Sequence, residues 1–327
     1  DTVQPIGIVP VKFNNRLDGA LVVVQDQHPI GEETLRIMEY AGPMVALVFA
    51  KENAVAEAQR QLTGDFLEEL INNTFNDEEL MERRASFLHF SLKEPVAVFV
   101  IRLSEQEDFG AVQPEEERQA RKEFLWDKVR EILSGENSVM LQFKSSALIG
   151  LARVKEDRDL RRLQALLTKV VREAQENLGR KAMTVGIGRP YPGARRVSQS
   201  YREALTAVKV GEALAKDAAV WYFGDLGPYR FLHELRGSQE MQAFHREVIG
   251  VIKSYDREHG TNLLETLACY FAHDGNLQST AAALYVHKNT VAYRLRKIEE
   301  ITGLSLRRPN DRFYLELGLR LDKMVDS

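Results

Sequence analysis

The residues whose types and spacing best fit a chemical task lie in one short segment near the C-terminus. Residues 287–297 read HKNTVAYRLRK, which places an amide, two hydroxyls and four strong cations within about three helical turns. Asn pairs with adenine and Arg or Lys with guanine, while Thr and Tyr reach base edges or phosphates. This set of residue types therefore predicts contact with DNA.

The candidate contacts divide by chemistry. We assign base contacts first to Lys288, Asn289, Thr290 and Tyr293, either a base or a phosphate to Arg294, and phosphates to Arg296 and Lys297, with His287 at the start of the same set. The basic residues in this stretch have no acidic neighbour between positions 287 and 298. Since the net charge of the chain is -4, any attraction for DNA must come from such a local positive face.

The surrounding apolar residues predict how these side chains are positioned. From Leu277 to Thr302 the spacing fits two helices that cross at a steep angle, which is typical of a helix-turn-helix. A small residue, Ala281, would allow close approach, and the wedge between the helices would consist of Leu284, Val286, Val291 and Leu295, extended by Ile298. Tyr285 stands in the turn where glycine is usual, and it departs from the pattern.

Two other interpretations of this segment are open from the residues alone. One is a helical hairpin with a solvated basic face, because basic helices are common. The other is a helical module that binds a partner protein. DNA binding that neutralises phosphates weakens steeply as salt rises, so salt dependence separates these cases.

The stretch from Ser254 to Leu306, followed by LELGLRL, closely resembles the C-terminal domain of PucR/CdaR-type bacterial regulators, and VHKNTVAYRL is its most specific part. The resemblance extends from about residue 60 to the end of the chain. It implies binding to double-stranded DNA as a homodimer or larger assembly, and it carries the DNA-contact role onto residues 287–294. It also implies control of a metabolic operon in response to a small molecule.

The middle of the chain predicts an α/β sandwich. Between residues 94 and 225 the apolar patterns follow the order β-α-β-β-α-β-α-β, with helices at 115–133, 157–178 and 198–215, which favours helices packed on a largely antiparallel sheet. VGIGRPYPGARRVSQSYREALTAVKVG resembles the GGDEF-like domain of the same regulators. Cyclases of that superfamily need carboxylates that bind two metal ions. Here the first strand ends in IRLS and the hairpin reads QFKSSAL, so we expect no cyclase activity.

Gly186, Gly188 and Gly193 follow a strand in a weak imitation of a phosphate-binding loop. Prolines interrupt the stretch and we expect no helix directly after it, so an ordinary strand-to-helix loop is favoured. Arg195 and Arg196 could bind an anion, although surface arginines are ordinarily solvated or paired.

The N-terminal segment predicts a hairpin and a long helix. IGIVPVKF and GALVVVQ flank a turn-like NNRLDG, and helical spacing continues past Pro43 towards Ile71. Val48, Val55 and Leu62 are seven residues apart, which fits either a short coiled coil with a second copy or a plain connector. Residues 1–58 resemble the last strands and closing helix of a GAF domain, with the rest expected outside this chain. His28 is more simply a loop residue than a ligand.

The overall properties agree with a multidomain α+β regulator. The 327 residues, 44% hydrophobic and 28% charged, contain no apolar run long enough to span a membrane, and we expect a cytoplasmic protein without a cofactor or metal. The single Cys269 lies among apolar residues and predicts a buried thiol. The expected domains are a partial GAF-like piece at 1–58, a helical connector at 59–93, a degenerate GGDEF-like sandwich at 94–225, and an all-α helix-turn-helix domain at 239–327.

Overall fold

The structure is a computed structural model that describes residues 6–13, 16–25, 30–103, 115–133, 139–144, 147–178, 183–214, 219–235 and 237–325. The chain divides into two compact units, residues 1–69 and 70–327. His28 lies outside the described residues. No helix in the described part is long and apolar enough to cross a membrane.

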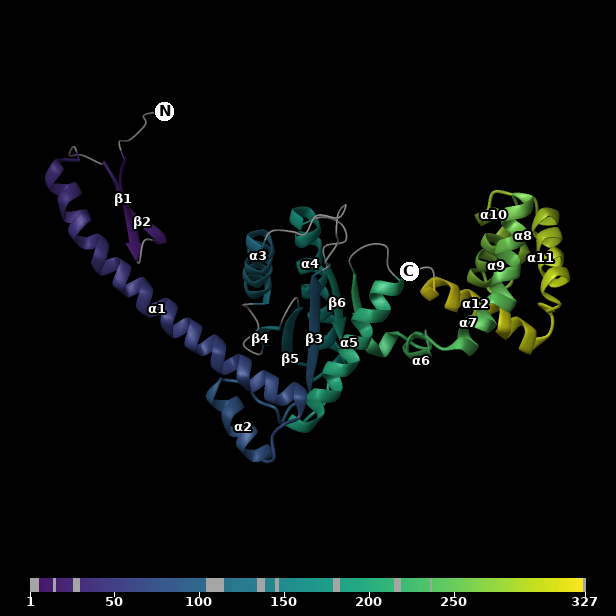
Figure 1. Cartoon of the computed structure of the whole chain (residues 1–327), viewed down its shortest axis with the longest axis horizontal. Helices are drawn as coiled ribbons and strands as arrows, with labels where there is room; N and C mark the ends of the chain where they lie inside the picture. Colours follow the sequence, from purple (N-terminus) through teal and green to yellow (C-terminus); the bar gives the residue numbers. More distant parts are fainter. Residues whose placement is uncertain are drawn as a thin grey trace. The chain divides into compact units, whose positions relative to one another are not determined.

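The first unit contains the predicted hairpin and long helix. Strands β1 (Ile6–Phe13) and β2 (Arg16–Val24) pair antiparallel, and α1 (Glu32–Asn72) continues through Pro43 as expected. β2 begins earlier than the apolar run suggested. The hairpin packs on the helix (Figure 1), since a Cβ on Gly7 would lie 3.1 Å from Leu35. The outer face of the hairpin leaves apolar side chains such as Ile8 and Val22 exposed.

The second unit begins with a five-stranded sheet and its helices (Figure 1). The elements are α2 (Glu78–Phe87), β3 (Val96–Leu103), α3 (Glu115–Leu133), β4 (Val139–Lys144), β5 (Ala147–Arg153), α4 (Asp157–Leu178), β6 (Met183–Ile187), α5 (Val197–Leu214) and β7 (Val220–Tyr222). The strand order is β4-β5-β3-β6-β7, antiparallel except for the β6–β7 pair. The predicted element order and largely antiparallel sheet are confirmed.

The central strand β3 divides the core between two helical layers. Phe99 and Ile101 are fully buried in the cluster that α3 and α4 complete with Leu125 and Leu167. Successive side chains of a strand point to opposite faces, so the alternate residues of β3 face α5. On that side the Oγ of Ser200 accepts a hydrogen bond from the Val98 amide. Helices therefore cover both faces of the sheet.

An ion pair between the partly exposed Arg189 and the buried Glu203 holds the loop after β6. Glu203, on α5, is 7% exposed, and its carboxylate accepts hydrogen bonds from Arg189 at 2.6 Å and from the Tyr191 hydroxyl at 2.7 Å. Burial alone would raise the pKa of Glu203, but these donors hold it below its usual value. Burial and the bond to Glu203 raise the pKa of Tyr191 to about 12. The network fixes the RPYP loop against α5.

The rest of the second unit is helical. The elements are a 3₁₀ turn (Phe223–Asp225), α6 (Tyr229–Leu235), α7 (Gln239–His245), a π-helical turn (Arg246–Gly250), α8 (Val251–His259), α9 (Leu263–Ala272), α10 (Leu277–Ala283), α11 (Lys288–Thr302) and α12 (Pro309–Val325). Gly260, Gly275 and Gly303 lie at breaks between these helices, each with a positive φ. Residues 226–238, which separate the expected sandwich from the expected helix-turn-helix domain, include α6, and α6 buries Leu232.

Helix α12 is shared by two clusters of buried side chains. Leu315 belongs to the core beneath α11. Further along the helix, Leu321 and Met324 pack with Leu232 of α6, and Leu214 of α5 lies against the same cluster. The C-terminal helix is thus part of the packing on both the helix-turn-helix side and the α5 side.

The Ser200 hydroxyl provides a test of the α5 layer. Ser200→Ala removes the acceptor of the buried Val98 amide and the donor to the Arg189 carbonyl, at 2.9 and 2.8 Å. A buried amide left without a partner lowers the free energy of unfolding by about 1–3 kcal/mol, which urea denaturation measures. Thr206→Ala is the matched control, because the Thr206 hydroxyl bonds only to the Arg202 carbonyl within α5. Equal stability of the two variants would contradict this account.

Candidate nucleic-acid interface

Helix α11 is held by an apolar face that packs on α8, α9 and α10. Val291 and Ile298 are fully buried, and Leu295 and Ala281 are each 6% exposed in the same cluster. Val286 packs against this cluster from the turn. The predicted wedge is therefore confirmed for these residues, and Leu284 is only half-buried at the end of α10. Burying one face of α11 leaves the opposite face available to solvent.

Side-chain caps fix where the two helices begin. The Oδ1 of Asn276 accepts from the amides of Gln278 and Ser279 at the start of α10. At the start of α11, the Nδ1 of His287 accepts from the Asn289 amide at 3.2 Å, so this nitrogen carries no proton. The capping role of His287 was missed by the sequence analysis, although a residue directly before a helix is the one placed to cap it.

The predicted base-contacting residues lie together at the exposed start of α11. Lys288 and Asn289 are exposed, Thr290 is half-buried, and Tyr293 is 61% exposed. Arg296 is also exposed, one to two turns further along. Asn289, Tyr293 and Arg296 are spaced by four and three residues, so they share one face of the helix. These side chains form a continuous polar strip, which we call the α11 outer face: Lys288, Asn289, Tyr293 and Arg296.

Two other predicted residues lie on a different side of the helix. The Arg294 guanidinium donates to the Oγ1 of Thr266 on α9 at 3.1 Å. The Lys297 ammonium pairs with Glu300 at 2.9 Å and lies 5.3 Å from the centre of the Tyr255 ring on α8. The hydrogen bond to Glu300 raises the pKa of Lys297. Both cations thus hold α11 against its neighbours.

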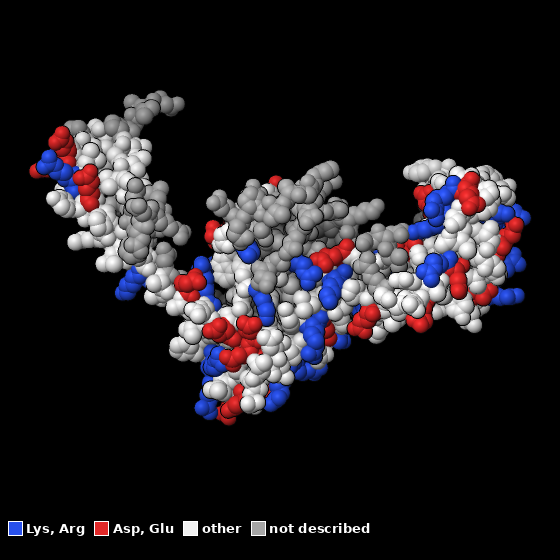
Figure 2. Space-filling view, in the orientation of Figure 1, with Lys and Arg blue, Asp and Glu red and all other residues white. Residues whose placement is uncertain are grey.

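The expectation of a cationic face without acidic neighbours needs correction. Glu300 lies just after residues 287–298, but it is one helical turn from Lys297 and pairs with it. On the face seen in Figure 2, Lys and Arg side chains alternate with Asp and Glu over this helical part of the chain. On that face the basic side chains therefore form small areas and not one large patch.

Tyr285 occupies the turn with an unusual backbone. Its φ is +54°, in the left-handed region, and its side chain is 96% exposed. Glycine reaches this conformation without a steric penalty, whereas an aromatic residue does not. The structure therefore shows why glycine is usual at this position.

The glycine within β6, Gly186, and the one just after it, Gly188, serve packing. A Cβ on Gly188 would lie 2.0 Å from the Ser200 carbonyl oxygen, and one on Gly186 would lie 2.2 Å from that of Ala204. Both glycines thus allow α5 to approach the sheet. The expectation that no helix follows directly was wrong, because a 3₁₀ turn (Ala194–Arg196) follows Gly193 and runs into α5.

The arginines of this turn have partners within the chain. Arg195 lies 3.7 Å from Glu78, and the Arg196 guanidinium lies 4.2 Å from the centre of the Tyr191 ring.

At the end of β3, Arg102 pairs with Glu212 at 3.1 Å. Ser104 and the turn residues 145–146 lie outside the described residues.

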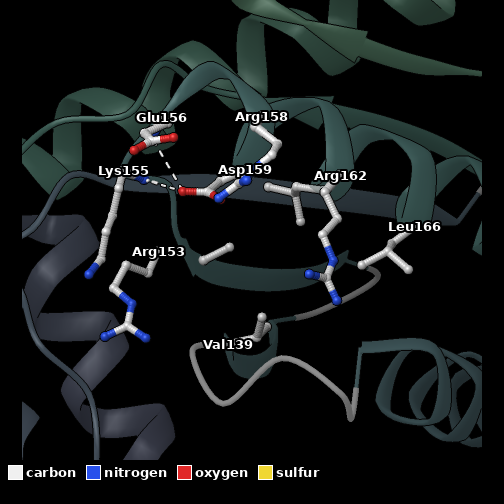
Figure 3. Close-up of a pocket in the computed structure, with 10 residues that line it drawn as sticks. Val139, Arg153, Lys155, Glu156, Arg158, Asp159, Arg162 and Leu166 are labelled. Carbon is white, nitrogen blue, oxygen red and sulfur yellow. Dashed lines mark hydrogen bonds between the residues drawn. The ribbon is translucent and has the colours of Figure 1, made fainter.

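A cavity of about 230 Å³ lies between the open end of the β4–β5 hairpin and α4. Figure 3 shows basic and acidic side chains around it, with the Oδ2 of Asp159 accepting from the amides of Lys155 and Glu156. Arg153 and Lys155 both pair with Glu94, at 3.2 and 2.5 Å. Two of the basic side chains that line the cavity are therefore already paired with a carboxylate.

Cys269 is half-buried on α9, not fully buried as the sequence predicted. Burial still raises the pKa of its thiol, which lowers the fraction of reactive thiolate. Among the described residues, no group of three or more His, Cys, Asp or Glu side chains could hold a metal ion.

Comparison with known proteins agrees with this geometry. Residues 263–321 match the PucR C-terminal helix-turn-helix domain, and residues 72–210 match a GGDEF-like domain. The chain is therefore a helix-turn-helix protein of the transcriptional-regulator class. With both domains in this order, it is a regulator of the PucR/CdaR type.

Relatives include two activators from Bacillus subtilis (strain 168). The DNA-binding transcriptional activator AdeR is 22% identical over 95% of this chain and 71% of its own length. The proline-responsive transcriptional activator PutR is 23% identical over 97% of this chain and 75% of its own length. The carbohydrate diacid regulator of Escherichia coli (strain K12) is 30% identical over 54% of this chain and 44% of its own length.

Proposed function

We propose that this regulator binds double-stranded DNA by inserting the start of α11 into the major groove, and that it controls a metabolic operon. The observation that carries the proposal is the α11 outer face, a strip of exposed polar side chains on a helix fixed by its buried wedge. In helix-turn-helix proteins the N-terminal residues of the second helix contact base edges. The partners of this surface would be the bases and phosphates of one duplex.

The residue roles follow from exposure. Lys288 and Asn289 are placed for guanine and adenine, with Thr290 and Tyr293 beside them, and Arg296 for a phosphate. His287 caps the helix through Nδ1, which leaves its Nε2–H as a donor to a phosphate. Arg294 and Lys297 act chiefly by positioning α11 through Thr266, Glu300 and Tyr255. This division revises the roles expected from residue type alone.

Salt dependence tests the phosphate role of Arg296. Arg296→Ala is expected to reduce the slope of log affinity against log salt by about one, because the variant neutralises one phosphate fewer and so releases about one counterion fewer on binding. Fluorescence anisotropy between about 50 and 200 mM salt measures this slope. Lys297→Ala is the control and should leave the slope nearly unchanged, since Glu300 already neutralises Lys297. An affinity that does not respond to salt in the unmodified protein would instead favour a helical module that binds a protein partner.

Self-association is supported by the exposed side of α1. Ile37, Met44, Val48, Val55 and Leu62 are 51–74% exposed and repeat with the four-and-seven spacing of a coiled-coil seam. The strip runs over about 38 Å of helix. Monomeric proteins rarely expose so extended an apolar surface. We therefore propose a homodimer in which two copies of α1 pair along this strip.

Charge placed in the strip tests the homodimer. Val48→Glu combined with Val55→Glu is expected to shift the molar mass from dimer to monomer in light scattering at micromolar protein, because carboxylates would face each other in the seam. Helical content by circular dichroism should persist, since both valines are exposed. Arg60→Gln also makes α1 more negative, but on the side of the helix opposite the apolar strip, so it should leave the molar mass unchanged. A monomeric unmodified protein would contradict the proposal.

A small-molecule signal is the second part of the proposed regulation. The N-terminal unit would receive it, as the partial GAF-like pattern suggested, and α1 would transmit it, because this helix runs without interruption from the first unit into the start of the second. A ligand can shift such an equilibrium only if it binds one arrangement more tightly. The signal would thus change how the paired C-terminal domains meet DNA.

The GGDEF-like domain is proposed to be a scaffold without catalysis. Arg102 stands at the end of β3 and pairs with Glu212, where the family's cyclases would need a carboxylate for metal. Incubation with GTP and magnesium is expected to yield no cyclic dinucleotide by liquid chromatography, with an active cyclase run in parallel as control. Detection of that product would overturn the assignment.

A further inference from the structure

Tyr285 combines backbone strain with almost complete exposure. The other non-glycine residues with positive φ in the described part of the chain are Asn73, His89 and Asp274, residue types that enter the left-handed region more readily. Tyr285, at φ +54°, has the largest side chain of this group and lies in the turn between α10 and α11. Its side chain therefore occupies a position that glycine would fill with less strain.

The fold gains little from this ring. The side chain is 96% exposed, and the apolar contact of the turn is made by the next residue, Val286. The backbone bond that Tyr285 makes, from its amide to the Ala282 carbonyl at 3.3 Å, is available to any residue except proline. Neither packing nor hydrogen bonding within the described residues offsets the strain.

The ring lies close to the surface proposed to enter the groove. Tyr285 is two residues before the capping His287 and three before Lys288, so its Cα lies within about 11 Å of that of Lys288. If α11 enters the major groove as proposed, a tyrosine at this distance is within reach of the sugar-phosphate strand that borders the groove. Its hydroxyl is a neutral hydrogen-bond donor, and its ring offers apolar contact to a sugar.

We propose that Tyr285 is a DNA-backbone contact, with its hydroxyl donating to a phosphate oxygen beside the groove that α11 enters. The inference rests on the proposed DNA binding and adds a contact to it. Phosphates carry no base sequence, so the contact raises affinity for every duplex by the same factor. A neutral donor releases no counterion, so it leaves the salt slope unchanged, unlike Arg296.

The experiment uses the full chain and two duplexes, one selected in vitro from a random pool for tight binding and one scrambled from it. Tyr285→Gly is expected to weaken binding to both by a similar factor, about tenfold, with an unchanged salt slope. Tyr285→Phe removes only the hydroxyl, so it should weaken binding to both duplexes by less than Tyr285→Gly does. Asn289→Ala is the contrast, because losing a base contact should narrow the difference between the two duplexes.

Stability is measured on the same variants. Tyr285→Gly is expected to raise the thermal midpoint by about 2 °C, because glycine relieves the strained φ, so weaker binding would not reflect unfolding. Binding by Tyr285→Gly equal to that of the unmodified protein would overturn the inference while leaving the proposed function intact. The inference would also be overturned if Tyr285→Gly were monomeric in light scattering, because its weaker binding would then follow from lost self-association. Failure of the unmodified protein to bind either duplex would overturn the proposed function itself.

Discussion

The burial of one face of α11 determines what the C-terminal domain can present to a partner. Val291, Leu295 and Ile298 pack inward together, which fixes the rotation of the helix about its own axis. One residue of slip would turn the helix by about 100° and replace this buried face with polar side chains. The same rotation directs Asn289 outward and Arg294 onto α9. The polar strip is a consequence of the apolar one.

Local patterns predicted much of this arrangement, because helices and their buried faces are encoded within a few turns of sequence. The bounds of α3 and α4 and the wedge beneath α11 followed from apolar spacing. The roles of the cations did not. Arg294 bonds to a residue 28 positions earlier and Lys297 lies over a ring on α8, and these neighbours are set by tertiary packing. Residue type alone therefore does not show that these two cations have partners within the domain.

The role of the glycines in the middle domain also could not be predicted from the sequence. A glycine that approaches a phosphate and a glycine that approaches a helix look identical in sequence, because both are selected for the absence of a side chain. Only the position of the Ser200 and Ala204 carbonyls assigns Gly188 and Gly186 to helix packing. Sequence-local patterns also do not predict the burial of Leu232 on α6, because it depends on α12, which lies about 90 residues further along.

The sharing of α12 between two clusters has a consequence for cooperativity. Leu315 contributes to the packing beneath α11, while Leu321 and Met324 contribute to the cluster that also includes α6. A helix melts most easily from its ends, but the middle and the last turn of α12 carry buried side chains that belong to different neighbours. Partial opening of either region would therefore expose apolar surface in the other, so the segment from α6 to α12 behaves as one energetic unit whose regions lose structure together.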